Sequence, residues 1–429
     1  MNAVLGARQG RTSGASQLHR VGASIAFSAA SFLVVATLVT TMDPARFAGI
    51  GLVYVLSSVL TNLVRYGLFD ATLAGQVPLD ACRAAARWLA LVMVLVTLVG
   101  MVAAVVLWLD LLAAAVVLGA GLSAGGDLAR MVRFCDGRSR EVLVGDLAWL
   151  IGIAVLAAAA GVGGVAPAVG AVGGWIIGGA GWTAVALGEG RVGSGGGGVA
   201  DWVGWRRLLA GTFAMAASGT GPYVGYLAGM AAVTAVGRPS AASLLEIGRL
   251  VGMPAVTVYA GLRVGVVASS PVAPAPTLWS GGPASVASGR PGMPHRAHLV
   301  AVGAALSSAA VLALSLVVVM VAPAGAGSAL DVARRWWPLI AASQLARLVV
   351  NVVSDAARPL LGPGAGVRIG VASAVLGAVI PPMLVLAVGD AGALLSQLAV
   401  VGLIYALIQG ALRVSTVAHR RWPHIRPTR

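Results

Sequence analysis

The chain has 429 residues, of which 59% are hydrophobic and only 10% are charged, and its mean hydropathy is +0.92. This composition excludes an ordinary soluble protein and indicates a membrane protein. The 29 basic residues are all arginines, and the absence of lysine excludes a Walker A ATPase and any Schiff-base enzyme. The formal net charge is +15, and its meaning depends on where the arginines lie.

Apolar segments long enough to cross a bilayer recur along the whole chain, since one helical crossing takes about 20 residues. The first follows Arg8, Arg11 and Arg20, and its apolar run of 22 residues is longer than a signal-peptide core of roughly 7–15, so we interpret it as an uncleaved helix. The pattern predicts an all-α integral membrane protein with about twelve transmembrane helices. We place them at 17–41, 45–68, 84–109, 111–133, 142–161, 166–188, 206–236, 240–267, 298–322, 331–355, 367–389 and 391–415.

The arginines alternate from one loop to the next. With a cytoplasmic N-terminus, 23 lie in segments on the cytoplasmic side, and four lie on the other side: Arg46, Arg238, Arg334 and Arg335. Because cytoplasmic loops collect arginine, this asymmetry predicts a multi-pass protein with both termini cytoplasmic. The composition is typical of a G+C-rich bacterial genome, so we expect the bacterial inner membrane. The net charge then reflects topology and contact with anionic membrane lipids rather than nucleic acid.

Two pairs of short motifs indicate an internal repeat. Asp43-Pro44 precedes the second helix and Arg238-Pro239 precedes the eighth, at an offset of 195. The letters DLARMV at 127–132 match QLARLV at 344–349, at an offset of 217. Two parallel six-helix bundles are therefore expected. We divide the chain into a tail at 1–16, bundles at 17–190 and 206–415, a Gly-rich linker at 191–205, a Pro/Gly-rich loop at 269–297 and a basic tail at 416–429.

The opening of the chain resembles a known family of transporters. The letters MDPARFAGIGLVYVLSSVLTNLVRYGLFD, together with LARMVRF and LARLVVN, are similar to those of polysaccharide flippases of the multidrug/oligosaccharidyl-lipid/polysaccharide exporter superfamily. The resemblance implies a V-shaped pair of bundles around a central cavity. It also implies movement of a polyprenyl-diphosphate-linked glycan from the inner to the outer leaflet, with polysaccharide-assembly enzymes as possible partners.

Two other functions stay open. A second kind of carrier, for a drug or a small solute, would share twelve helices, although the loop between helices 2 and 3 lacks the paired basic residues typical of major-facilitator carriers. A polyprenyl-dependent membrane glycosyltransferase would need carboxylates on a large extracytoplasmic loop, and the loops predicted there are short. We therefore expect a carrier rather than an enzyme.

Charges inside membrane helices are candidates for function. Arg249 lies ten residues after Pro239, about 15 Å along a helix and thus near the middle of a core about 30 Å thick. Glu246 precedes it by three residues and shares its face. In one interpretation Arg249 binds the diphosphate and Glu246 controls its availability or takes up a coupling proton. In the other, the two residues only neutralise each other.

Two further groups of polar residues are weaker candidates for the substrate site. Gln344, Arg347 and Asn351 lie on one stripe of the tenth helix, either in the cavity or as an anchor near its cytoplasmic end. Asn62 with Arg65, and Asp127 with Arg130, lie near the cytoplasmic surface and could attract the anionic headgroup. Anchoring of the helices at the membrane surface is the alternative for both pairs.

Metal and cofactor sites are not expected. His295 and His298 lie in the Pro/Gly-rich loop region without further ligands nearby, and the other histidines lie in the tails. Cys82 and Cys135 fall on the predicted cytoplasmic side, where thiols stay reduced, so a disulfide is not expected.

Overall fold

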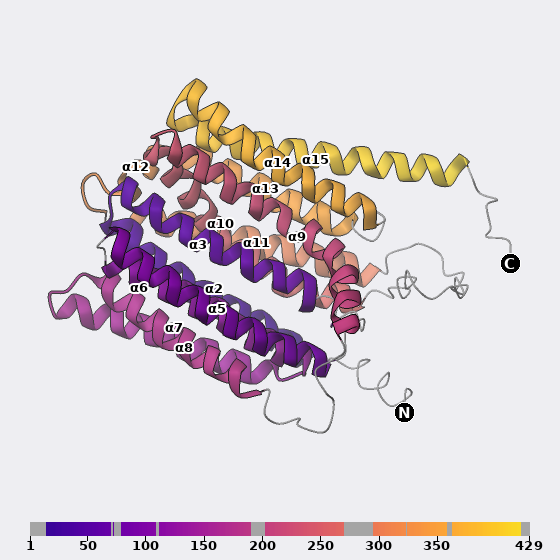
Figure 1. Ribbon diagram of the computed structural model, residues 1–429. Coiled ribbons are helices and arrows are strands. Elements are labelled where there is room, and N and C mark those ends of the chain that lie inside the picture. Colours follow the sequence, from indigo (N-terminus) through magenta and orange to yellow (C-terminus); the bar gives the residue numbers. More distant parts are fainter. Residues whose placement is uncertain are drawn as a thin grey trace.

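The computed structural model describes residues 14–69, 72, 79–108, 111–189, 202–269, 295–322, 324–357 and 363–421. Its regular elements are all helices, and the long ones run side by side (Figure 1). The first half contains α2 (Gly14–Thr41), α3 (Pro44–Val64), the π-helix η1 (Arg65–Phe69), α5 (Leu79–Trp108), α6 (Leu111–Cys135), α7 (Ser139–Val162) and α8 (Pro167–Glu189). The second contains α9 (Trp202–Ala235), α10 (Pro239–Ser269), α11 (His295–Val321), α12 (Ala329–Arg334), α13 (Trp337–Ala357), α14 (Pro363–Val388) and α15 (Asp390–Arg421).

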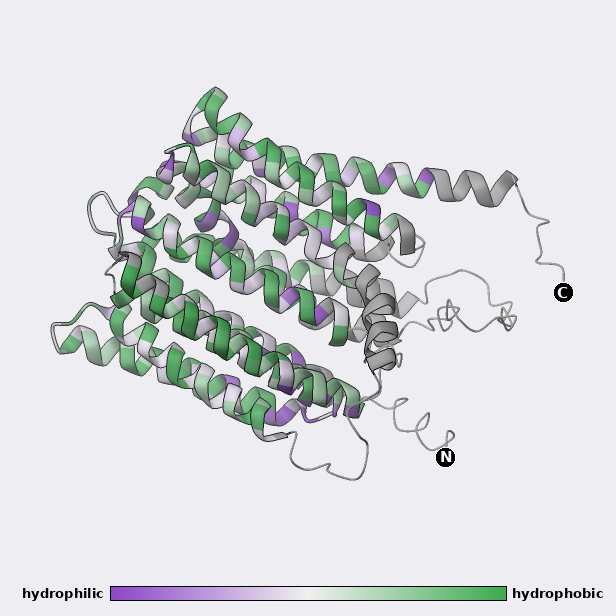
Figure 2. Ribbon diagram, in the orientation of Figure 1, coloured by the Kyte–Doolittle hydropathy of each residue, from purple (hydrophilic) through white to green (hydrophobic). Residues whose placement is uncertain are grey.

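The described helices are built for a bilayer. Within the described ranges, nine helices are long and apolar enough to span a membrane. Hydrophobic residues cover most of their length, and hydrophilic residues gather near the ends and at a few interior positions (Figure 2). Large apolar side chains on the outside are exposed, among them Ile151 and Leu386, as expected where lipid replaces water. The prediction of an all-α, multi-pass membrane protein is confirmed.

The starts of equivalent helices follow from local chemistry. Asp43 caps α3, because its Oδ1 accepts hydrogen bonds from the backbone N–H groups of Ala45 and Arg46, each at 3.0 Å. Pro44 then occupies the first helical position, where a missing N–H costs nothing. Before α10, Gly237 adopts a left-handed φ of 74° and Pro239 again begins the helix. Both starts therefore agree with the two Pro-containing turns in the sequence.

One predicted helix is divided in the structure. The segment predicted as 331–355 forms the short α12, a turn at Arg335 and Trp336, and then α13. Ser328 caps α12 through the backbone N–H of Asp331, so a helix begins upstream of the predicted start. Pro338 sits one residue after the start of α13, where its missing N–H is tolerated but where it could not continue a longer helix. The prediction of one continuous helix was wrong at this point.

The helix pairs of the two halves correspond. In the first half α2 packs against α7, and α6 against α5 and α8; in the second α9 packs against α14, and α13 against α11 and α15. The halves meet where α2 and α3 pack against α9 and α10, and we call this contact region the seam. Most of the predicted linker at 191–205 and of the loop at 269–297, and the ends of both tails, lie outside the described residues, so the domain boundaries stay predictions.

Two helix backbones approach each other closely between α9 and α14. A Cβ atom at Gly221 would lie 2.1 Å from the carbonyl oxygen of Gly370, and one at Gly229 would lie 2.2 Å from that of Gly377. Small residues spaced four apart let membrane helices approach in this way. The glycine spacing of 221, 225 and 229 therefore has a packing role that the high glycine content of the chain conceals in the sequence.

Candidate functional site

Arg249 and Glu246 form an ion pair one turn apart on α10. The Arg249 Nε donates a hydrogen bond to Glu246 Oε2 at 2.9 Å, and Nη2 donates to Oε1 at 2.5 Å. Their side chains are only 2% and 1% exposed. Every residue from 241 to 250 is buried, so this stretch of α10 is enclosed on all sides. Pairing is what allows a charge to be buried in such surroundings.

The ion pair lies at the seam between the two halves. The guanidinium carbon of Arg249 is 5.0 Å from the ring centroid of Tyr54 on α3, a cation–π contact across the seam. The Nη1 of Arg249 donates to the Sδ of Met253 at 3.1 Å, and a thioether is a weak acceptor. Glu246 packs against Gly51 of α3, where an added Cβ would lie 2.7 Å from the Glu246 Cγ. The first half thus supplies the ring of Tyr54 and, at Gly51, the space for the ion pair of the second half.

Two more polar groups belong to the same place. Arg347 of α13 is half-buried and interacts electrostatically with both Glu246 and Tyr226. The hydroxyl of Tyr226, on α9, is buried and interacts with the carboxylate of Glu246. We call Tyr54, Tyr226, Glu246, Arg249 and Arg347 the seam cluster. Two arginines and one glutamate leave this cluster with a surplus of one positive charge.

The seam is closed in this conformation. A cavity of about 10 Å³ adjoins Glu246, Tyr54 and Gly51, and apolar residues of α2, α3, α6, α8 and α10 line the rest of it. This volume holds one water molecule at most. Arg249 is therefore enclosed and would meet a substrate only after the two halves separate along the seam.

Arg130 is enclosed by protein near the end of α6. It is 2% exposed and lies five residues before the last residue of that helix, Cys135, so its expected place close to the membrane surface stays a prediction. Its Nε donates to Asp146 Oδ1 at 2.8 Å, its Nη2 donates to Asp146 Oδ2 at 2.7 Å, and its Nη1 donates to Asp127. The ring of Phe27 lies 3.8 Å from the guanidinium carbon. We call Phe27, Asp127, Arg130 and Asp146 the Arg130 cluster; it joins α2, α6 and α7.

Gln344 belongs to a neutral network beside the seam cluster. Its Nε2 donates to the Oε1 of Gln397 on α15 at 2.8 Å, and the Nε2 of Gln397 donates to the carbonyl oxygen of Leu245 at 3.1 Å. The network connects α13, α15 and α10 and places Gln344 one turn before Arg347. Asn351 is half-buried one turn beyond Arg347. Of Gln344, Arg347 and Asn351, Arg347 is the residue that belongs to the seam cluster.

Asn62 and Arg65 are half-buried near the end of α3. The Nδ2 of Asn62 donates to the carbonyl oxygen of Ser58 at 2.8 Å, a bond within the same helix. Arg65 begins η1, where the helix widens by one residue per turn. Asn62 follows Tyr54 by eight residues, or about 12 Å along the helix, so Asn62 and Arg65 lie away from the seam cluster.

Sequence reasoning missed four members of the two clusters: Phe27, Tyr54, Asp146 and Tyr226. Asp146 interrupts an apolar helix and could have been found as an intramembrane carboxylate. Tyr54 and Tyr226 carry no such signal, since a tyrosine in an apolar helix is compatible with ordinary packing. No group of three or more His, Cys, Asp or Glu residues that could bind a metal occurs in the part of the chain that the structure describes.

Comparisons with known proteins concern the overall arrangement of helices. No family model matches the chain, and no curated protein matches it by sequence. The chain is similar to the solved structure of the eukaryotic MATE transporter AtDTX14, at 13% identity and a TM-score of 0.49, over 95% of this chain and 98% of that chain. It is also similar to the MATE transporter ClbM, solved in complex with Rb⁺, at 13% identity and a TM-score of 0.48, over 93% of this chain and 96% of that chain.

Proposed function

We propose that this protein is a membrane exporter that moves an anionic, lipid-linked substrate from the inner to the outer leaflet, and that the seam cluster binds the anionic group. The substrate class that fits best is a polyprenyl-diphosphate-linked saccharide. The observation that carries the proposal is the surplus positive charge of Arg249, Glu246 and Arg347 at the contact between the two halves. The resemblance of the sequence to polysaccharide flippases supports the choice of substrate.

The physical argument concerns the cost of moving an anion through hydrocarbon. A diphosphate that leaves water loses strong hydrogen bonds, and a fixed cation on its path replaces part of them. Arg249 has donors in reserve, because the partner of its Nη1 is the weak acceptor Met253. Glu246 accepts hydrogen bonds from the Nε and Nη2 of Arg249 in the closed state. A diphosphate entering an opened seam would compete with Glu246 for the same guanidinium, and closure of the opposite side would restore the ion pair.

The proposal also includes a place and a direction. We place the protein in a bacterial inner membrane with both termini cytoplasmic, because the arginines alternate between loops. The start of α2 and the end of α15 lie at the same end of the bundle, as an even number of crossings requires (Figure 1). Enzymes that assemble and extend the saccharide would then act on opposite faces of the membrane.

The test removes the charges of the seam cluster without leaving one of them unpaired. Loss of Arg249 alone leaves a buried carboxylate, which costs about 3–5 kcal/mol and could unfold the protein. The double variant Glu246→Gln/Arg249→Gln removes both charges and keeps side chains of similar size. Cells depleted of the protein are complemented with the wild type, with the double variant, or with Arg368→Gln, which removes an exposed arginine of the same half. The leaflet in which the lipid-linked saccharide accumulates is then measured.

We expect accumulation in the inner leaflet on depletion, rescue by the wild type and by Arg368→Gln, and no rescue by the folded double variant. Rescue by the double variant would remove the seam cluster from the mechanism. If depletion causes no accumulation of any lipid-linked saccharide, the flippase function is discarded in favour of a carrier for a drug or a small solute.

A further inference from the structure

A long groove lies on the outer face of the first half, away from the seam. It runs between α7 and α8, has a volume of about 730 Å³, and lies within the size range of ligand sites in proteins. In Figure 1 these two helices lie at the edge of the bundle. Arg133 and Arg140 lie at one end of the groove, and Leu156 and Gly174 lie towards the other.

Glycines shape the groove in two ways. Gly145 and Gly178 allow two tryptophan rings to pack at the base of the groove. A Cβ at Gly145 would lie 2.4 Å from the ring of Trp182, and a Cβ at Gly178 would lie 1.9 Å from the ring of Trp149. Gly152 and Gly181 also line the groove, but a Cβ at either position would meet nothing within 4 Å. Because these two glycines have no side chain, the apolar part of the groove, which we call the trough, stays open beside them.

The groove is long enough to hold an acyl chain of one lipid leaflet along its whole length. From Arg140 to Leu156 α7 advances about 24 Å, more than the ~15 Å that half of a ~30 Å hydrocarbon core requires. Apolar residues along its rim face outwards, with Val144 59% and Ile177 65% exposed. In a membrane this surface is covered by lipid chains.

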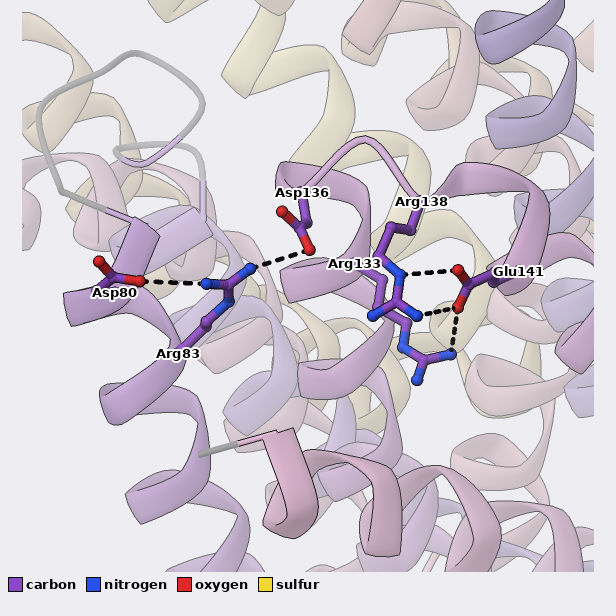
Figure 3. A network of polar contacts seen from close by, with 6 residues as sticks. All are labelled: Asp80, Arg83, Arg133, Asp136, Arg138 and Glu141. Atoms are coloured by element: carbon purple, nitrogen blue, oxygen red, sulfur yellow. Dashed lines mark hydrogen bonds and ion pairs between the residues drawn. The ribbon is translucent and has the colours of Figure 1, made fainter. Parts of the chain in front are cut away.

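The arginine end of the groove carries surplus positive charge. Glu141 pairs with Arg133 at 3.2 Å and with Arg138 at 2.7 Å, so one carboxylate serves two guanidinium groups (Figure 3). Arg133 also lies over the ring of Trp182, with 5.5 Å from its guanidinium carbon to the ring centroid. Arg140 is exposed, and no ion pair within the described ranges involves it. Guanidinium groups match the oxygens of a phosphate in geometry and charge.

We infer that this groove is a binding site for one anionic diacyl phospholipid, with its phosphate between Arg133 and Arg140 and one acyl chain along the trough past Gly181 and Gly152. A cationic end joined to an apolar trough complements an anionic headgroup joined to an acyl chain. The occupant links α7 to α8 along their outer face. This inference does not depend on the proposed function, because the groove lies outside the seam.

The first test varies the headgroup. The full-length protein is delipidated in detergent and titrated with phosphatidylglycerol or with phosphatidylethanolamine, and bound lipids are counted by native mass spectrometry. We expect phosphatidylglycerol to bind roughly tenfold more tightly, and Arg140→Gln to remove most of that difference, because a charge-assisted contact is lost. Arg138→Gln, next to the groove but not lining it, is the matched control and should change the affinity by about twofold or less.

The second test fills the trough. Gly181→Phe projects into open space and should abolish tight binding of phosphatidylglycerol, whereas Gly402→Phe, at an exposed glycine of α15 that also has nothing within 4 Å, should leave it unchanged. Equal binding of the two lipids, or unchanged binding by Arg140→Gln, would overturn the inference. So would full competition by glycerol phosphate, because the trough would then contribute nothing. A wild-type dimer that Gly181→Phe converts to a monomer would assign the groove to a second copy of the chain instead.

Discussion

Within the described residues two arginines are buried, and their surroundings differ. Arg130 contacts two carboxylates, one on its own helix and one on α7, within a single half of the molecule. Arg249 contacts one carboxylate on its own helix, and it also contacts an aromatic ring of the other half and a thioether. The Arg130 cluster therefore carries a surplus of negative charge, and the seam cluster a surplus of positive charge.

The difference separates a structural contact from a candidate binding site. Strong acceptors on two helices occupy the donors of Arg130, so this arginine connects helices that stay together. Arg249 is paired within one helix and meets the other half through weaker contacts, so the two halves can separate without breaking its ion pair. An anion-binding residue in a moving protein needs this second arrangement, because its surroundings must open and close.

The largest expected effect comes from removing Arg130. Arg130→Met leaves Asp127 and Asp146 buried without their cation, and we expect the free energy of unfolding to fall by about 3–5 kcal/mol or the protein not to accumulate. Unfolding in mixed detergent micelles measures this loss. The triple variant Asp127→Asn/Arg130→Met/Asp146→Asn should recover most of the stability. A stable single variant would show that the cluster does not connect the helices.

A smaller effect should follow from crowding the seam. The Cβ of Gly51→Ala would lie 2.7 Å from the Cγ of Glu246 and 2.8 Å from the Cε of Met230, so the side chain of Glu246 or the backbone beside it must shift, at a cost of about 1–3 kcal/mol. Gly49→Ala, on the same helix with nothing within 4 Å, is the matched control and should be neutral or stabilising by up to ~1 kcal/mol. Thermal unfolding of both variants decides the comparison. Equal unfolding temperatures for Gly51→Ala and Gly49→Ala would mean that the helices at the seam pack less tightly than described.

The neutral network beside the seam should contribute less than either charged cluster. Gln397→Leu removes the acceptor of Gln344 and the donor to the Leu245 carbonyl, and we expect a loss of about 1 kcal/mol for each bond left unmade. Unfolding in micelles measures the loss, and Gln344→Leu/Gln397→Leu together should cost less than the sum of the two single variants. Additive losses would indicate that the two amides act independently.

The smallest effect is expected for a partly exposed ion pair between α5 and the turn that follows α6. Asp136 contacts Arg83 at 2.9 Å, but about a third of each side chain is exposed (Figure 3). Asp136→Asn should lower the free energy of unfolding by less than about 1 kcal/mol, and the difference should shrink in 1 M salt. The same measurement on Arg130→Met should depend little on salt. A large, salt-independent loss for Asp136→Asn would contradict the distinction between buried and exposed pairs.

Local features of the chain were predictable in detail. The starts of α3 and α10 at Pro44 and Pro239 follow from the turns that precede them, and the pairing of Glu246 with Arg249 follows from their spacing on one helix. These features depend on residues within one or two helical turns, and their physical causes act at that range. The division of the tenth crossing into α12 and α13 was missed, because an apolar segment hides a cap at Ser328 and a proline near the next start.

By itself the sequence determined that the chain is a multi-pass helical membrane protein and that Arg249 shares a helix face with Glu246, because apolar length and helical spacing are local properties. Only the tertiary structure decided that Arg130 is buried, since its second carboxylate, Asp146, comes from the next helix. It alone placed Tyr54 and Tyr226 beside the ion pair of α10 and opened the groove between α7 and α8. Those contacts depend on how helices pack, and packing is set by the summed fit of many side chains that no single pattern in the sequence contains.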